Sequence, residues 1–441
     1  MILYFILMSA VLYVAHLSTR KNRWFAPGRF LVFVLLVHGL LLKPLIVAFE
    51  VPSKEIVESL IINPINSDYY WEKSWLIIIF YLIFAVSMLV GAVLFSGKKT
   101  VSRVNSNTIR FEISLIWIFY FIGLAAVIQF LVLNPELIAT GSKNSLATDD
   151  ITEYFGFGAL RLMELICFML PFVLIQNIAS HYKVKQSWRL AIISSTTHII
   201  FLYLSDQRGG LLFSVLSWAI SYNLLIAPIK RKLFLYAMVF ALALGLFKTF
   251  NRLSADNVVD IQATSEVVAN IAGKNFVEIS KTISTFDAVD LKIGYMLGGT
   301  YLDALSIFIP RTFYPTKTTV NLDTIVGREV YGCEAVGACG VPPGLLAESY
   351  LNFGYVWVLI STIIIGFMVG VIDKLALSRS STIRNIYAIN LVYFGVSIMG
   401  SSVASYLTQT IFHLVVFGAI YIICRKPTMN LASNKFSIAL K

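Results

Sequence analysis

Long apolar runs, separated by shorter polar segments, follow one another along almost the whole chain. Each run is near twenty residues long, which is what a helix needs to cross a hydrocarbon core of about 30 Å. The pattern therefore predicts an all-α polytopic membrane protein with about 11 transmembrane helices and no separate soluble domain. The predicted helices cover residues 2–17, 30–48, 75–95, 111–133, 157–178, 190–204, 211–227, 233–249, 355–373, 386–403 and 410–424.

The polar segments alternate in charge. Lysine and arginine gather after every odd-numbered predicted helix, whereas acidic side chains dominate the segments after the second and fourth helices. Short cytoplasmic loops carry an excess of Lys and Arg in membrane proteins. We therefore predict that the amino terminus lies outside, that the carboxyl terminus lies in the cytoplasm, and that the stretch before residue 355 lies outside.

The amino-acid composition also indicates a membrane protein. The chain is 58% hydrophobic and only 13% charged, whereas soluble domains carry about 25% charged residues. The net charge of +11 is explained by the basic cytoplasmic loops, so nucleic acid is not an expected partner. The first apolar run follows Met1 without a basic segment or an obvious cleavage site, which indicates a retained helix rather than a removed signal peptide.

One connection is long enough to hold structure of its own. It divides the chain into helices 1–8 at residues 1–249, an extracytoplasmic active-site loop at 250–354, and helices 9–11 with a cytoplasmic tail at 355–441. Two clusters of apolar residues in the loop predict short amphipathic helices. They are Val267, Val268, Ile271, Ile279 and Ile283, and then Leu302, Leu305, Ile307 and Phe308. Their apolar faces either contact lipid or pack on the transmembrane bundle.

Ionisable side chains in or beside membrane helices are costly, so each is a candidate for a functional site. Those on the outer side are mostly cationic, which favours a site for an anion, although each alone is also explained by snorkelling or an ion pair. The set comprises Lys43, Arg161, Glu164, Arg208, Lys248, Arg252, Arg311, Lys317 and His413.

Two arginines are the most specific candidates for binding that anion. Arg208 is followed by Gly209 and Gly210 at the start of a predicted helix, where free N–H groups favour phosphate. The alternative is a tight turn with a solvated arginine. Arg311 follows Pro310 and precedes Pro315, and this rigidity limits the entropy that its guanidinium loses on binding.

Glu348 is the candidate general base. It follows the turn at 342–344 and leads into Tyr350, Asn352 and the ninth predicted helix. A carboxylate in a partly dry cleft can accept a proton from a substrate. The alternative is a carboxylate that only interacts with the macrodipole of the helix. His413 is a second candidate base, although a lone histidine at a helix end is more often structural.

The four cysteines do not have the spacing of a metal site. Cys333 and Cys339 flank a short segment on the outer side, where thiols oxidise, so we expect a small disulfide ring. Cys167 and Cys424 lie within predicted helices and are expected to be inert. No metal and no cofactor is expected.

Three segments, in this order, resemble the Wzy-type O-antigen polymerase family of bacterial membrane proteins. They are Ser205-Asp206-Gln207-Arg208-Gly209-Gly210, then Ile309-Pro310-Arg311 with Pro315-Thr316-Lys317, then residues 344–354 with Glu348, Tyr350 and Asn352. The likeness extends over nearly the whole topology. One departure is Ala219, which stands where an arginine-plus-glycine repeat of some members has glycine.

The resemblance implies a C-type glycosyltransferase fold in the bacterial inner membrane. The donor would be a growing glycan on undecaprenyl pyrophosphate, and the acceptor would be one repeat unit on the same lipid. A chain-length regulator and a flippase would be partners in the same membrane. Arg208, Arg311 and Glu348 would be catalytic, and substrate would be bound by Lys317, Arg252, Lys43, Arg161, Tyr350, Asn352 and His413. An O-antigen ligase and a transporter or lipid flippase remain as alternative functions.

Overall fold

The structure is a computed structural model that describes part of the chain. The described residues are 2–19, 27–42, 67–94, 109–133, 155–204, 208–227, 229, 279–306, 322–331, 343–400 and 402–426. The first half holds α1 (Ile2–Thr19), α2 (Pro27–Val37), η1 (His38–Leu42), α5 (Ser67–Leu94), β1 (Arg110–Phe111), α6 (Ile113–Leu133), α8 (Phe155–Ala179), α9 (Val184–Leu204) and α10 (Arg208–Leu225). The second half holds α13 (Ile279–Ala288), η4 (Val289–Ile293), α14 (Gly299–Ser306), α15 (Leu322–Tyr331), α16 (Leu345–Ile372), η5 (Leu375–Leu377), α17 (Ser381–Gly400), α18 (Val403–Cys424) and β2 (Arg425–Lys426).

The described part is an all-α membrane protein. Five of its helices are long and apolar enough to cross a membrane. They lie within Ile2–Thr19, Trp71–Leu94, Ile113–Val132, Leu345–Leu377 and Tyr406–Cys424. Shorter apolar helices cover Gly28–Leu41, Glu164–Ala179 and Phe213–Leu225. The predicted span at 233–249 lies outside the described residues, and the total of eleven spans stays a prediction.

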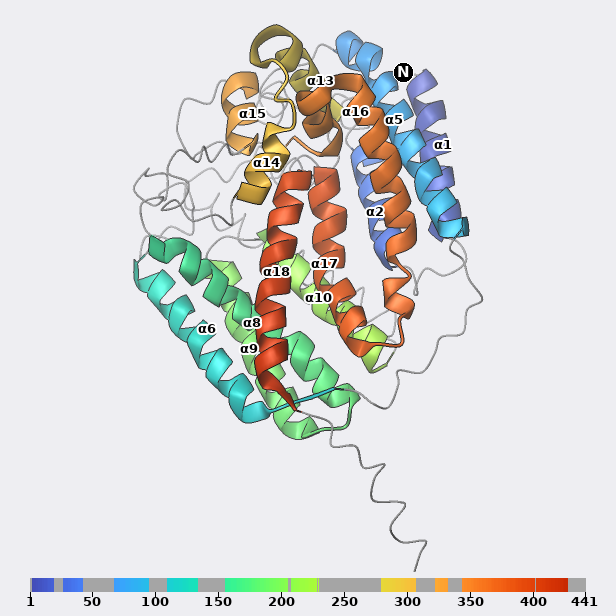
Figure 1. The fold of residues 1–441 in the computed structure, drawn as a ribbon. Helices are drawn as coiled ribbons and strands as arrows, with labels where there is room; N and C mark the ends of the chain where they lie inside the picture. The colour runs from blue at the N-terminus through green and yellow to red at the C-terminus, as the bar shows by residue number, and fades with distance from the viewer. Residues whose placement is uncertain are drawn as a thin grey trace, which may run out of the picture.

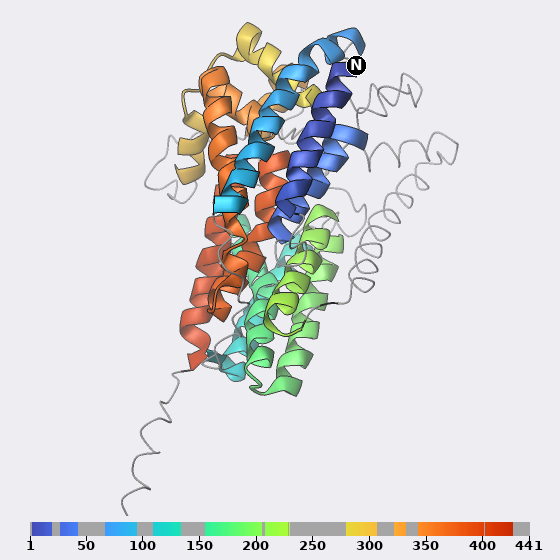
Figure 2. The ribbon, with the colours of Figure 1, turned by 90° about the vertical axis from the view of Figure 1, so that its right-hand side faces the viewer.

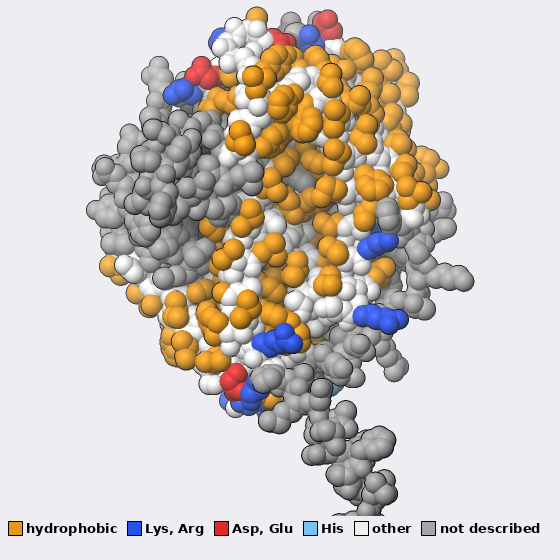
Figure 3. Space-filling view, in the orientation of Figure 1, with side chains coloured by type: hydrophobic (Ala, Val, Ile, Leu, Met, Phe, Trp, Pro, Cys, Tyr) orange, Lys and Arg blue, Asp and Glu red, His pale blue; other side chains and the backbone are white. Residues whose placement is uncertain are grey.

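The helices form two groups with α17 and α18 between them. Helices α1, α2, α5 and α16 pack around one core, and α6, α8, α9 and α10 pack around another (Figure 1). A view from the side shows the first group and α13 in the upper part, and the second group below (Figure 2). Apolar side chains cover most of the described face, and charged side chains lie near its edges (Figure 3).

Glycines bring α5 and α16 into close contact. A Cβ at Gly366 would lie 2.5 Å from the carbonyl oxygen of Phe84, and one at Gly370 would collide with the carbonyl oxygen of Met88. Small residues four apart allow this approach in membranes, where packing rather than the hydrophobic effect drives association of helices. The step from Gly366 to Gly370 on α16 matches the step from Phe84 to Met88 on α5, so the two helices run in the same direction. The alternating topology predicts this for the third and ninth spans, which both run from outside to inside.

The substitution Gly370→Ala is expected to lower the free energy of unfolding, because its methyl group forces α5 and α16 apart. Overpacking of this kind costs about 1–3 kcal/mol. The matched control is Gly418→Ala on α18, where a new Cβ would have no atom within 4 Å. Thermal unfolding in detergent should show a lower midpoint for the first variant only. Equal midpoints would contradict the packing described for Gly370.

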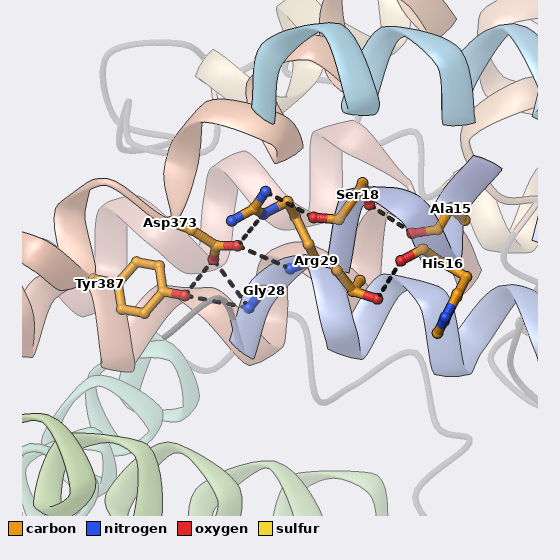
Figure 4. A network of polar contacts seen from close by, with 8 residues as sticks. Ala15, His16, Ser18, Gly28, Arg29, Asp373 and Tyr387 are labelled. Atoms are coloured by element: carbon orange, nitrogen blue, oxygen red, sulfur yellow. Dashed lines mark hydrogen bonds and ion pairs between the residues drawn. The ribbon is translucent and has the colours of Figure 1, made fainter. Parts of the chain in front are cut away.

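A buried carboxylate joins four helices near the carboxyl end of α16 (Figure 4). Asp373 accepts hydrogen bonds from the backbone N–H of Gly28 at 3.1 Å and from Nε of Arg29 at 2.7 Å. It also accepts one from the Tyr387 hydroxyl on α17 at 2.5 Å. Arg29 in turn donates to the carbonyl oxygen of Ser18 on α1 at 2.8 Å. The contacts cap the amino terminus of α2, so we interpret Asp373 as structural.

The end of the molecule where β1 pairs with β2 is basic. Arg110 pairs with Lys426 in a short antiparallel ladder, and Glu112 forms ion pairs with Lys426 and Lys183. The hydrogen bond from Lys426, together with Lys183, lowers the pKa of Glu112 to about 2. The helices α13, α14 and α15 lie at the opposite end of the molecule (Figure 1). The described helices of the long polar stretch are therefore separated from the basic end, as the charge pattern predicts.

Several predicted boundaries were wrong, and α5 and α9 begin at Ser67 and Val184 rather than at 75 and 190. The ninth helix was expected to begin at 355, but α16 begins at Leu345 and contains a break at Phe353 and Gly354. Gly354 has a φ of 68°, a left-handed conformation that glycine adopts easily, so the glycine interrupts the helix without ending it. The connection expected between 403 and 410 lies earlier, since α17 ends at Gly400 and α18 begins at Val403.

The expected amphipathic helices are present where the structure describes them. Ile279, Ile283 and Phe286 of α13 are buried against the core formed with α5 and α16, so this apolar face packs on the bundle. Helix α14 covers part of the second apolar cluster and leaves Leu302 exposed. Val267, Val268, Ile271, Ile307 and Phe308 lie outside the described residues.

Candidate functional site

Several predicted site residues lie outside the described part of the chain. They are Lys43, Lys248, Arg252, Arg311, Lys317, Cys333 and Cys339. The disulfide therefore stays a prediction. The two remaining cysteines, Cys167 and Cys424, are buried and free.

The backbone positions of Arg161 and Arg208 are described, because the two residues lie on α8 and α10. Helix α10 begins at Arg208, earlier than the residue 211 expected from sequence, so Gly209 and Gly210 form its first turn. The backbone N–H groups of that turn have no acceptor within the helix. Arg161 lies one turn before Glu164 on α8, which packs against α10. Both arginines therefore lie toward the amino-terminal ends of two helices that are in contact.

Glu348 is fully buried in the first turn of α16. Its Oε2 accepts a hydrogen bond from the backbone N–H of Val403, the first residue of α18. Its Oε1 lies 3.4 Å from Oγ1 of Thr300 on α14, which donates to it. Sequence analysis had placed Glu348 in the polar loop facing a cleft, and the structure places it inside the junction of three helices instead. The carboxylate satisfies a free N–H group at the start of α18.

Asn352 fixes the segment between η4 and α14 onto the break in α16. Its amide donates to Oγ1 of Thr300 and to the carbonyl oxygen of Glu348, both at 2.8 Å. Its Oδ1 accepts from the backbone N–H of Gly298 at 3.0 Å. The break leaves the carbonyl oxygens of Leu351 and Asn352 without donors from their own helix. The backbone N–H of Met296 donates to Leu351 at 2.8 Å, and that of Leu297 donates to Asn352 at 3.0 Å.

Tyr350 and Tyr295 hold the carboxylate of Asp290. The Tyr350 hydroxyl donates to Oδ1 of Asp290 at 2.7 Å, and the Tyr295 hydroxyl donates to the same oxygen at 3.4 Å. The Tyr350 ring is buried and stacks on Phe286 with centroids 4.0 Å apart. Asp290 is exposed, and Tyr355 lies edge-on to Tyr350 at 4.7 Å. These contacts make a rigid aromatic cluster with one carboxylate at its surface.

Tyr301 of α14 completes the surroundings of Glu348. Trp357 donates its indole N–H to the Tyr301 hydroxyl at 3.1 Å. Burial raises the pKa of Tyr301 to about 12, and the charge of Glu348 adds to the rise. The phenol therefore keeps its proton near neutral pH and can donate a hydrogen bond but cannot act as a base.

A second polar cluster lies between α8, α9 and α10. Nδ1 of His198 lies 2.8 Å from Oε1 of Glu164, and Nε2 lies 3.0 Å from Oγ of Ser214. All three side chains are buried. The rings of His198 and His413 both lie 5.4 Å from Phe168 between ring centroids. An intramembrane carboxylate paired with an imidazole marks a functional or specific structural site.

His413 belongs to this second cluster. Because α18 begins at Val403, His413 lies ten residues along it and not near its start, as sequence analysis had assumed. At a rise of 1.5 Å per residue, that is about 15 Å from the carboxylate of Glu348 along the helix axis. His413 and Glu348 are therefore separate candidates, and the structure does not bring them to one site.

Sequence reasoning missed Asp290, His198 and Ser214. Asp290 stands in the polar stretch without a recognisable motif, and only the fold places it between two tyrosines. His198 and Ser214 lie in apolar runs, where a rule that flags every ionisable residue inside a membrane helix would have found the histidine. Among the described residues, no group of three His, Cys, Asp or Glu side chains could hold a metal ion.

The fold and these sites define the class of the protein as an α-helical membrane protein with a structured polar end. Comparison with known proteins found no matching family model, no matching curated protein and no matching solved structure.

Proposed function

We propose that the protein is an O-antigen or surface polysaccharide polymerase, a glycosyltransferase of the bacterial inner membrane. It would join oligosaccharide repeat units carried on undecaprenyl pyrophosphate at the periplasmic face. The proposal rests on the three segments that resemble the Wzy-type family, in the same order along the chain. The observation that supports it best is the structured polar end, where residues 289–300 are fixed onto the break in α16, opposite the basic end.

In the proposed reaction, a hydroxyl of the acceptor repeat unit attacks the anomeric carbon of the donor glycan. The bond from that carbon to the pyrophosphate oxygen breaks, and the lipid pyrophosphate leaves with the electron pair. Charge develops on the leaving oxygens, so cations in a site of low dielectric constant stabilise the transition state. Arg208 and Arg311 would bind the pyrophosphate, with Lys317, Arg252, Lys43 and Arg161 around them.

Deletion of the gene tests this function against its two rivals. Loss of a polymerase should leave lipopolysaccharide with a single repeat unit on its core, because ligation and export of single units continue. Loss of a ligase would leave bare core, and loss of a flippase would trap lipid-linked units on the cytoplasmic face. A ladder of normal length in the deletion strain would contradict the proposed function.

A further inference from the structure

The proposed reaction needs a group that accepts the proton of the attacking hydroxyl. Glu348 was the candidate, but its side chain has no exposed surface, and both its oxygens accept hydrogen bonds within the protein. The donor to Oε2 is the first N–H of α18, a group that needs an acceptor in any membrane helix. Moving Glu348 to a substrate would break the junction of α14, α16 and α18. These contacts describe a structural carboxylate.

Asp290 has the properties that Glu348 lacks. It is exposed, and it lies at the polar end, on the π-helical turn that follows α13. Tyr350 and Tyr295 both donate to its Oδ1, which fixes the orientation of the carboxylate. Within the described part of the chain, Oδ2 accepts no hydrogen bond. An oriented carboxylate with one open oxygen can receive a proton from a bound hydroxyl.

The rings around Asp290 offer a surface for a sugar. The side chains of Tyr295 and Tyr355 are 50% and 46% exposed, although both rings pack edge-on against the buried Tyr350. A saccharide places its C–H face on an aromatic ring and turns its hydroxyls to polar groups at the ring's edge. Tyrosines at a membrane interface also contact lipid headgroups, but lipid contact does not account for a carboxylate held between them by two phenols.

We propose that Asp290, and not Glu348, accepts the proton of the attacking hydroxyl, and that Tyr295 and Tyr355 hold the acceptor saccharide beside it. This inference rests on the proposed function. The acceptor O–H bond breaks as its oxygen bonds to the anomeric carbon, and the proton moves to Oδ2 of Asp290. The lipid pyrophosphate departs with the electron pair, and Asp290 afterwards releases its proton to water.

The test compares three variants of the full-length purified protein, with a lipid-pyrophosphate-linked repeat unit as substrate. Asp290→Asn keeps an oxygen for both tyrosines but cannot accept a proton, so its kcat should fall about a hundredfold or more. Its thermal midpoint should not change. Glu348→Gln should lower the thermal midpoint, and the protein that remains folded should keep its rate. Glu329→Gln on α15, a carboxylate paired with the exposed Arg328, is the control and should resemble wild type.

Two further readouts separate a base from a structural group. Asp290→Glu, which keeps a carboxylate, should retain part of the rate that Asp290→Asn loses. Tyr355→Ala should raise the KM for the acceptor about tenfold with little change in kcat, because Tyr355 packs on Tyr350 and makes no hydrogen bond to Asp290. A fall of kcat of tenfold or less in Asp290→Asn would overturn the inference, and so would loss of activity in folded Glu348→Gln. If wild type itself forms no glycosidic bond, the proposed function fails and the inference falls with it.

Discussion

Alanine in place of Arg208 or Arg311 is expected to lower polymer formation about a hundred- to a thousandfold. Each guanidinium would bind pyrophosphate oxygens whose charge grows as the glycosidic bond breaks, so its contact strengthens in the transition state. Removing one such donor typically costs about 2.7–4 kcal/mol of activation free energy. The helix start at Arg208 adds free backbone N–H groups to this site. The measurement is the rate of polymer synthesis per amount of folded protein in the membrane.

Lysine and a remote arginine provide the controls. Lysine at either position should restore only part of the rate, because a point charge cannot reproduce the planar, forked guanidinium. Arg379→Ala, between η5 and α17, should leave polymer length unchanged. Full-length polymer from both Arg208→Ala and Arg311→Ala at normal protein levels would show that these arginines are structural. The pyrophosphate would then bind elsewhere.

The second large effect is expected on stability, from the buried pair of Glu164 and His198. His198→Ala leaves the carboxylate of Glu164 buried without its imidazole partner at 2.8 Å. Leaving a buried polar group without its partner costs about 1–3 kcal/mol, because that group keeps its desolvation penalty. The change also removes the contact of Nε2 with Ser214. The thermal midpoint in detergent should fall sharply.

A double variant measures the interaction between Glu164 and His198 apart from the contacts that each makes with other residues. If Glu164 and His198 stabilise the bundle through each other, the loss in Glu164→Ala/His198→Ala should be smaller than the sum of the two single losses. Ser217→Ala is the matched control, since this buried hydroxyl of α10 has no hydrogen-bond partner among the described residues. Additive losses, or a loss in Ser217→Ala equal to that of His198→Ala, would argue against the pair.

The apolar runs were sufficient to predict the class of fold and the approximate ranges of most described helices. Hydrophobic length depends on local sequence alone, so α1, α5, α6 and α18 were recognisable from it. The separation of α13, α14 and α15 from the basic end also followed from charge. The position of Glu348 did not, because Gly354 was interpreted as the last residue of the loop, whereas it is a break within a helix.

The candidate sites depend on contacts between residues far apart in the sequence. Asp290 meets Tyr350 only because residues 296–298 bond to the carbonyls exposed by the break in α16. Glu164, His198 and Ser214 come from three helices, and neither spacing nor periodicity relates them. The sequence identifies side chains that are costly to bury, whereas the structure shows which of these side chains are in contact with one another.

The most direct test of the proposed polymerase is reconstitution of the purified protein in lipid vesicles. The substrate is a single repeat unit linked to undecaprenyl pyrophosphate, with no lipid A core present. The proposal predicts glycan chains of several repeat units on one lipid, with one undecaprenyl pyrophosphate released for each linkage formed. It also predicts that Arg208→Ala forms almost none. Unchanged single units under these conditions, or transfer only after lipid A core is added, would contradict it.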